Sequence, residues 1–145
     1  IKKQTRLKAI GNIEKLPNGT LKALKETISQ TQHFNRRTLV LALNYSGRDE
    51  ILRAANKLKG EKNEITWELL EKNLDTSSIP DPDMILRTSG EMRLSNFMML
   101  QAAYSELYFS PTPWPEFTPE EFEKIIDSFG NRERRFGKTG AQVKA

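Results

Sequence analysis

The segment at residues 38–43, TLVLAL, constrains the fold of this chain more than any other feature of its sequence. The run is almost entirely apolar, so both faces of the strand that it predicts must be covered. In a parallel sheet, helices cover both faces of a central strand. Residues 20–32 before the run and residues 48–59 after it carry apolar residues at helical spacing. This alternation predicts an α/β fold with a parallel sheet flanked by helices.

The other segments continue the alternation. Strands are predicted at residues 7–10, 83–86 and 107–109, and helices at residues 66–73 and 96–104. A further helix begins at Thr118, which is placed to cap it, with Pro119 at the first helical position. The 145 residues correspond to about one domain. We expect residues 1–137 to belong to a single domain and residues 138–145 to be a flexible tail.

The composition excludes several classes of protein. The absence of cysteine excludes disulfides, cysteine metal sites and cysteine nucleophiles. No apolar run approaches the roughly 18 residues of a membrane-spanning helix, and the first residues lack the apolar core of a signal peptide, which fits a cytoplasmic protein. The net charge of +4 permits an anionic ligand or membrane surface. No zinc spacing or nucleic-acid recognition motif is present, so no nucleic-acid partner is expected.

The strongest candidate site follows the strand at residues 83–86. Arg87 lies at the carboxyl end of that strand, where parallel sheets bind their ligands. Arg93 follows across a turn containing Gly90, so both guanidinium groups can face one anion, and each can donate two parallel hydrogen bonds. Ser95 adds a hydroxyl donor, and the first amides of the helix expected at residues 96–104 would favour an anion there. This pattern predicts a diphosphate site, and the alternative is a set of surface ion pairs, Arg93 with Glu91 and Arg87 with Asp83.

Glu106 is the second candidate, because it stands in an otherwise uncharged stretch, AAYSELYF. A buried carboxylate is costly unless it is paired or bound to a metal. One carboxylate could hold Mg²⁺ only together with substrate phosphates or another acid. The alternative is an arginine partner inside the fold. The basic residues Arg132, Arg134 and Arg135 are typical of a solvated helix end.

Several blocks together resemble the signature of the cis-prenyltransferases. They are DMILRTSGE at residues 83–91, RLSNF at 93–97, AYSELYF at 103–109, RERRFG at 132–137 and NYSGR at 44–48. Their order and spacing fit from Leu7 to about Thr139, nearly the whole chain. Residues 1–137 are then identified as the C-terminal part of a single cis-prenyltransferase domain.

The resemblance implies an enzyme that adds isopentenyl diphosphate units in cis to an allylic prenyl diphosphate, with Mg²⁺ as cofactor. The expected product is a long-chain polyprenyl diphosphate such as undecaprenyl diphosphate. The resemblance also implies a homodimer, with peripheral contact to the inner face of the membrane for release of the product. It implies that the substrate is bound by Arg87, Arg93, Ser95 and the backbone of Leu94. It also implies that Glu106 binds the metal, and that Arg135 and Gly137 contact the site of the neighbouring subunit.

One part of the family pattern has no counterpart in this sequence. The Asp-Gly-Asn-Gly-Arg loop, which binds the allylic diphosphate and supplies a metal-binding aspartate, belongs to the family's N-terminal portion. No catalytic residue is therefore assigned here, and we expect the 145 residues by themselves to be inactive. The alternative is a non-catalytic accessory subunit of a heteromeric enzyme, although such subunits usually lose the arginine turn that is intact here.

Overall fold

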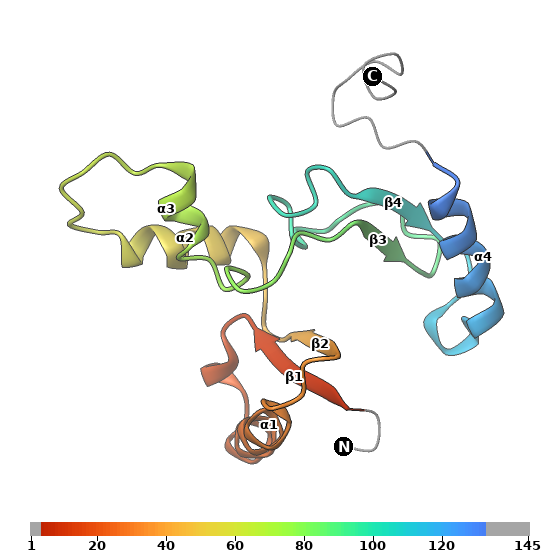
Figure 1. The fold of residues 1–145 in the computed structure, drawn as a ribbon, viewed down its shortest axis with the longest axis horizontal. Coiled ribbons are helices and arrows are strands. Elements are labelled where there is room, and N and C mark those ends of the chain that lie inside the picture. The colour runs from red at the N-terminus through yellow and green to blue at the C-terminus, as the bar shows by residue number, and fades with distance from the viewer. Residues whose placement is uncertain (1–3, 133–145) are drawn as a thin grey trace. The chain divides into compact units, whose positions relative to one another are not determined.

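The computed structural model describes residues 4–132, which divide into two compact units with the boundary between Pro80 and Asp81. The first unit contains β1 (Thr5–Ile10), α1 (Asn18–Thr31), β2 (Arg37–Ala42), α2 (Gly47–Lys57) and α3 (Trp67–Glu71) (Figure 1). The second contains β3 (Met84–Arg87), β4 (Glu106–Phe109) and α4 (Pro119–Gly130). Short 3₁₀ turns at Ile13–Lys15 and Trp114–Glu116 complete the elements.

The strands of each unit form a parallel pair. β1 pairs with β2 from Thr5 opposite Arg37 to Ile10 opposite Ala42, and β3 pairs with β4 from Met84 opposite Glu106 to Arg87 opposite Phe109. The predicted α/β class with parallel strands and flanking helices is therefore confirmed. Within residues 4–132 the four strands form two separate pairs.

Capping side chains set the starts of three helices, and the cap at Thr118 was predicted from the sequence. The hydroxyl of Thr118 accepts a hydrogen bond from the amide of Glu121 with Pro119 at the start of α4, and Thr66 caps α3 in the same way through Leu69. Ser46 caps α2. Each cap satisfies an amide that has no partner inside its helix.

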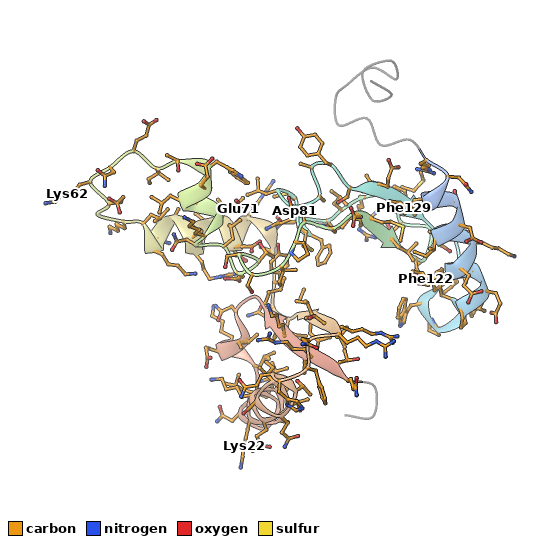
Figure 2. The ribbon with its side chains drawn as sticks, viewed as in Figure 1. Lys22, Lys62, Glu71, Asp81, Phe122 and Phe129 are labelled. Atoms are coloured by element: carbon orange, nitrogen blue, oxygen red, sulfur yellow. The ribbon has the colours of Figure 1, made fainter. Side chains whose placement is uncertain are left out.

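The first unit is built on β1. Helix α1 packs against this strand (Figure 1), and the buried hydroxyl of Thr31 accepts a hydrogen bond of 3.0 Å from the amide of Leu7. Figure 2 shows Lys22 extending from α1 away from the β1–β2 pair. Its side chain is 80% exposed, whereas Leu24 and Thr31 of the same helix are buried, so α1 is amphipathic, as the spacing of its apolar residues predicts.

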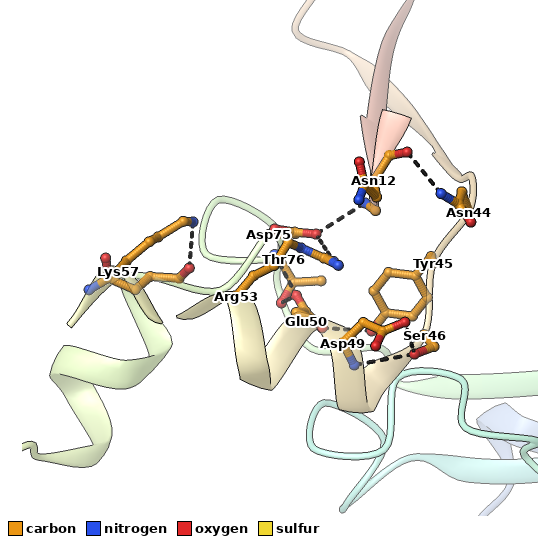
Figure 3. A network of polar contacts seen from close by, with 12 residues as sticks. Asn12, Asn44, Tyr45, Ser46, Asp49, Glu50, Arg53, Lys57, Asp75 and Thr76 are labelled. Carbon is orange, nitrogen blue, oxygen red and sulfur yellow. Dashed lines mark hydrogen bonds and ion pairs between the residues drawn. The ribbon is translucent and has the colours of Figure 1, made fainter. Parts of the chain in front are cut away.

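A buried carboxylate ties α2 to the loop that follows α3 (Figure 3). Glu50 is 1% exposed. Its carboxylate accepts hydrogen bonds from the Tyr45 hydroxyl at 2.6 Å and from the amide and hydroxyl of Thr76 at 3.0 and 2.9 Å. Burial of a charged group is tolerated when its oxygens are hydrogen-bonded in this way.

Asp75, next to Thr76, makes a second tie in the same network (Figure 3). Its Oδ2 accepts from the amide of Gly11 at 3.1 Å and from Nη2 of Arg53 at 2.5 Å. Gly11 has φ of +97°, and a Cβ at this position would lie 2.3 Å from the carbonyl oxygen of Leu43. The end of β1 therefore requires glycine, both for its backbone conformation and for the close approach of the chain after β2.

The prediction of a helix at residues 96–104 is wrong. Ser95, Asn96 and Met98 have φ of +48°, +64° and +44°, in the left-handed region that a right-handed helix cannot contain. A series of turns replaces it, held by hydrogen bonds such as that from the amide of Ala102 to the Met98 carbonyl at 2.8 Å. Without a helix beginning at Ser95, no helix N-terminus contributes amides to an anion there.

None of the helices in residues 4–132 has the length and apolar character that crossing a bilayer requires. The proposed tail at residues 138–145 lies outside the described residues, and the assignment of residues 1–137 to a single domain stays a prediction.

Candidate functional site

The turn after β3 is fixed to the segment that follows β4. Ser89 and Gly90 have φ of +68° and +70°, so the chain reverses sharply after Arg87. The amide of Ser89 donates to the Thr112 carbonyl at 2.9 Å, and the amide of Gly90 donates to the Ser110 carbonyl at 2.9 Å. These two bonds hold the base of the turn in place beside the end of the parallel pair.

Arg87 joins the two sides of this turn. Its Nη1 donates to Oγ of Ser95 at 2.9 Å and to the backbone carbonyl of Arg93. The structure therefore brings Arg87, Arg93 and Ser95 together at this turn, and the binding of one anion by both guanidinium groups stays a prediction. Ser95, whose hydroxyl makes this contact, has a left-handed backbone conformation.

A cavity of about 310 Å³ opens at this point. Its lining combines two cations and one hydroxyl with apolar side chains, and consists of Ile85, Leu86, Arg87, Arg93, Leu94, Ser95 and Phe97. Guanidinium and hydroxyl donors suit an anionic head group, and the apolar residues suit a short hydrocarbon. The arrangement fits a small ligand that carries a diphosphate and an apolar part.

Arg93 also forms the ion pair with Glu91 that the surface-pair alternative predicted. The side chains of Arg93 and Glu91 are 64% and 41% exposed. An ion pair so exposed contributes about 0–1 kcal/mol, because water screens it and two long side chains must be held still. A diphosphate carries several negative charges, so it can compete with one carboxylate for Arg93.

Glu106 has the arginine partner that was the alternative to a metal. Nη1 of Arg132 donates to Oε2 of Glu106 at 2.7 Å, and the Glu106 side chain is 27% exposed. The strand register sets Glu106 beside Met84, three residues before Arg87, a separation of about 10 Å along the strand. Because side chains alternate between the two faces of a strand, Glu106 and Arg87 project from opposite faces. The structure therefore does not bring Glu106 to the arginine cavity.

These positions bear on the expected magnesium ion. Mg²⁺ takes six oxygen ligands in near-octahedral geometry. Within residues 4–132, no group of three or more acidic, histidine or cysteine side chains gathers to hold a metal. Glu106 is one carboxylate, paired with a cation and distant from the cavity. As they stand, the described residues do not fit a magnesium site.

Two predicted site residues, Arg135 and Gly137, lie outside the described residues. Sequence analysis gave no role to Ile85, Leu86 and Phe97, which line the cavity, or to Arg132 as the partner of Glu106. Phe97 lies two residues after Ser95 in the RLSNF block, and this closeness in sequence could have indicated that Phe97 lines the same cavity. The Arg132–Glu106 pair had no local signal, because 26 residues separate the two positions.

The fold and the cavity describe a parallel α/β protein with an arginine-lined site, and comparison with known sequences identifies its family. A prenyltransferase family model, described as "putative undecaprenyl diphosphate synthase", matches residues 1–137. The chain belongs to this prenyltransferase family.

Individual relatives agree with the family. The isoprenyl transferase of Thermotoga maritima is 46% identical over 141 residues, covering 94% of this chain and 60% of the relative. That of Listeria monocytogenes (serotype 4b, strain F2365) is 45% identical over 144 residues, covering 94% of this chain and 57% of the relative. The chain thus spans about three-fifths of the length of these curated relatives.

Two solved structures share the fold. A probable undecaprenyl diphosphate synthase from Campylobacter jejuni has a TM-score of 0.84 and 40% identity, over 94% of this chain and 65% of that chain. Lavandulyl diphosphate synthase from Lavandula x intermedia, in complex with dimethylallyl diphosphate, has a TM-score of 0.87 and 30% identity, over 92% of this chain and 61% of that chain.

Proposed function

We propose that this chain carries the isopentenyl diphosphate site of a cis-prenyltransferase that makes a long-chain polyprenyl diphosphate, namely undecaprenyl diphosphate. The observation that carries the proposal is the cavity in which Arg87, Arg93 and Ser95 meet apolar side chains. Family membership supports it, as does a relative of the same fold whose structure holds a prenyl diphosphate.

In this proposal the chain binds and orients the donor. Arg87 and Arg93 donate hydrogen bonds to the diphosphate, Ser95 adds its hydroxyl, and Leu94 contributes through its backbone. The apolar wall that includes Leu86 and Phe97 holds the five-carbon group, so that its double bond faces the allylic substrate. The double bond then attacks the allylic carbon, the allylic C–O bond breaks, diphosphate leaves, and a proton is lost from the donor. Fixing the donor in this orientation is the contribution to rate that these residues make.

Other parts of the proposal rest on the resemblance. These are Mg²⁺ with Glu106 as one ligand, a homodimer in which Arg135 and Gly137 reach the neighbouring subunit's site, and a cytoplasmic location with peripheral membrane contact. The 145 residues by themselves are expected not to turn over, because the allylic-diphosphate loop of the family has no match in them. No step above is assigned to the metal, since the described residues do not fit one.

The test is direct binding of isopentenyl diphosphate by calorimetry without added metal. Arg87→Ala removes charge-assisted hydrogen bonds of about 1.5–3 kcal/mol, so the dissociation constant should rise by roughly 10- to 150-fold. The matched control is Arg36→Ala, at an exposed arginine outside the cavity lining, and it should bind like the parent. If the parent and Arg87→Ala bind isopentenyl diphosphate with equal affinity, isopentenyl diphosphate does not bind in this cavity.

A non-catalytic accessory subunit is the competing function. The intact arginine turn favours the catalytic enzyme, because binding residues for the donor are retained. Mixing the chain with a catalytic relative discriminates between the two. Stimulation of that relative's rate without binding of isopentenyl diphosphate to this chain would support the accessory role.

A further inference from the structure

The segment that follows β4 supports the turn that carries the arginines. Residues 88–93 belong to neither a helix nor a strand, so the position of this turn depends on bonds to other segments. Ser110, the first residue after β4, makes two of them. Its amide donates to the Arg87 carbonyl at 2.8 Å, and its carbonyl accepts from the amide of Gly90 at 2.9 Å. The backbone of Ser110 therefore bonds to the base and to the middle of the turn.

The side chain of Ser110 makes two further hydrogen bonds in a buried position, since the residue is only 4% exposed. Its hydroxyl donates to Oε1 of Glu121, in the first turn of α4, and accepts from the amide of Thr112 at 3.1 Å. A hydroxyl has one proton to donate, so the bond to Glu121 fixes its rotation. The Thr112 carbonyl accepts from the amide of Ser89. Both backbone contacts of the turn with this segment therefore adjoin the Ser110 hydroxyl.

Glu121 links this hydroxyl to a helix. Its amide donates to the Thr118 hydroxyl that caps α4, at 3.2 Å. Helix α4 lies beside the end of β4 (Figure 1), and the carboxylate of Glu121 joins the two. Hydrogen bonds to carboxylates are shorter and stronger than those between neutral groups. The bond between Ser110 and Glu121 therefore fixes the segment after β4 to the first turn of α4.

We propose that Ser110 and Glu121 are positioning residues for the isopentenyl diphosphate site. Their bond fixes the segment after β4, and that segment holds the arginine turn in the position from which it binds the diphosphate. Neither side chain is among those that line the cavity, so both act through the turn. The inference rests on the proposed function and adds two residues that this function requires outside the cavity.

The bond should affect donor binding because hydrogen bonds are directional. A guanidinium donor weakens steeply as its angle to the acceptor departs from linear, and a small displacement of a binding group costs much of its contribution. Without the Ser110–Glu121 bond, the turn keeps its backbone contacts but loses the side chain that orients the segment behind it. Arg87 and Arg93 would then meet the diphosphate with poorer geometry.

The test measures the affinity of the full-length protein for isopentenyl diphosphate by calorimetry without added metal, together with the melting temperature. Ser110→Ala should raise the dissociation constant about three- to tenfold, and Glu121→Ala should do the same. Glu121→Gln keeps a carbonyl oxygen that accepts from Ser110 and should stay within about twofold of the parent. The double variant Ser110→Ala/Glu121→Ala should bind no more weakly than either single variant, because both remove one bond.

Ser105→Ala is the matched control. Ser105 directly precedes β4 as Ser110 directly follows it, and its hydroxyl donates to the Pro82 carbonyl at 2.5 Å. Five residues, roughly 16 Å of extended chain, separate the two serines. Ser105→Ala should therefore lower the melting temperature as Ser110→Ala does, while its affinity for isopentenyl diphosphate stays within about twofold of the parent.

The outcomes separate the positioning role from a structural one. Lower melting temperatures in both serine variants with equal donor affinities would overturn the proposal, as would a Glu121→Gln variant that binds as weakly as Glu121→Ala. The two Glu121 variants decide the question if Ser110→Ala does not fold. If Arg87→Ala weakens donor binding and Ser110→Ala does not, the positioning role alone fails. If neither weakens it, the proposed function fails as well.

Discussion

Glu50→Ala is the substitution for which the structure gives the clearest expected cost. It removes a carboxylate that is 1% exposed and leaves the Tyr45 hydroxyl and the amide and hydroxyl of Thr76 without this acceptor. The change also leaves a space in the packing between α2 and the loop after α3.

The magnitude follows from those contacts. A hydrogen bond to a charged group is worth about 1.5–3 kcal/mol. The three bonds share one carboxylate, so their energies do not add, and removal of a buried charge also relieves its desolvation cost. We therefore expect Glu50→Ala to lower the free energy of unfolding by about 3–5 kcal/mol, a large part of the roughly 5–15 kcal/mol of a typical domain.

The measurement is urea unfolding of the full-length protein followed by circular dichroism. The midpoint should fall while the slope with denaturant stays constant, as for a loss of native-state contacts. Glu50→Gln is the matched control, because its carbonyl oxygen still accepts from Thr76 and its volume is almost the same. Glu50→Gln should lower the free energy of unfolding by about 1–2 kcal/mol. An alanine variant within 1 kcal/mol of the parent would refute the structural role given to this network.

Three other predictions concern the turn, the backbone and a helix cap. Ser95→Ala should weaken isopentenyl diphosphate binding about tenfold in calorimetry, since one hydroxyl donor is lost, and an unchanged affinity would exclude that hydroxyl from the site. Gly60→Ala should lower the free energy of unfolding by about 1 kcal/mol, because alanine is strained at its positive φ. Gly11→Ala should lower it by about 2 kcal/mol more than Gly60→Ala does, because its Cβ would also meet backbone. Equal melting temperatures of the two variants would contradict this expectation. Thr118→Ala should destabilise α4 by about 1 kcal/mol in urea unfolding. The backbone amide of Glu120 and then the Thr118 hydroxyl lower the pKa of the Glu120 carboxyl. The stabilisation from Glu120 is therefore present near neutral pH and lost as the pH falls through the lowered pKa, and in Thr118→Ala that pKa, measured by NMR titration, should move back up.

Elements with strong local signals were predictable. The apolar run at residues 38–43 corresponds to β2, offset by one residue. The expected cover on both faces of this strand is wrong for the described residues, because no residue of β2 is buried and Leu39 is 52% exposed. Thr118 and Pro119 fixed the start of α4, because the capping hydrogen bond is made between residues close in sequence. The meeting of Arg87 with Ser95 was predictable for the same reason, since a turn of a few residues brings them together.

The helix predicted at residues 96–104 shows where local signals fail. Its composition is apolar and free of charge, which suits a helix. Ser95 instead turns into the left-handed region, where its hydroxyl meets the guanidinium of Arg87. A side-chain hydrogen bond across the turn and the turns that follow thus take the place of a helical preference worth less than about 1 kcal/mol per residue.

The sequence by itself determined the family, the parallel α/β class and the arginine turn, because these depend on burial patterns, capping residues and neighbours within a few positions. Only the tertiary structure decided the partner of Glu106 and its separation from Arg87. The ion pair with Arg132 joins residues far apart in the chain, and the position of Glu106 follows from the register of β3 against β4. Neither leaves a mark in local sequence, because register and long-range pairing are set by how whole elements pack.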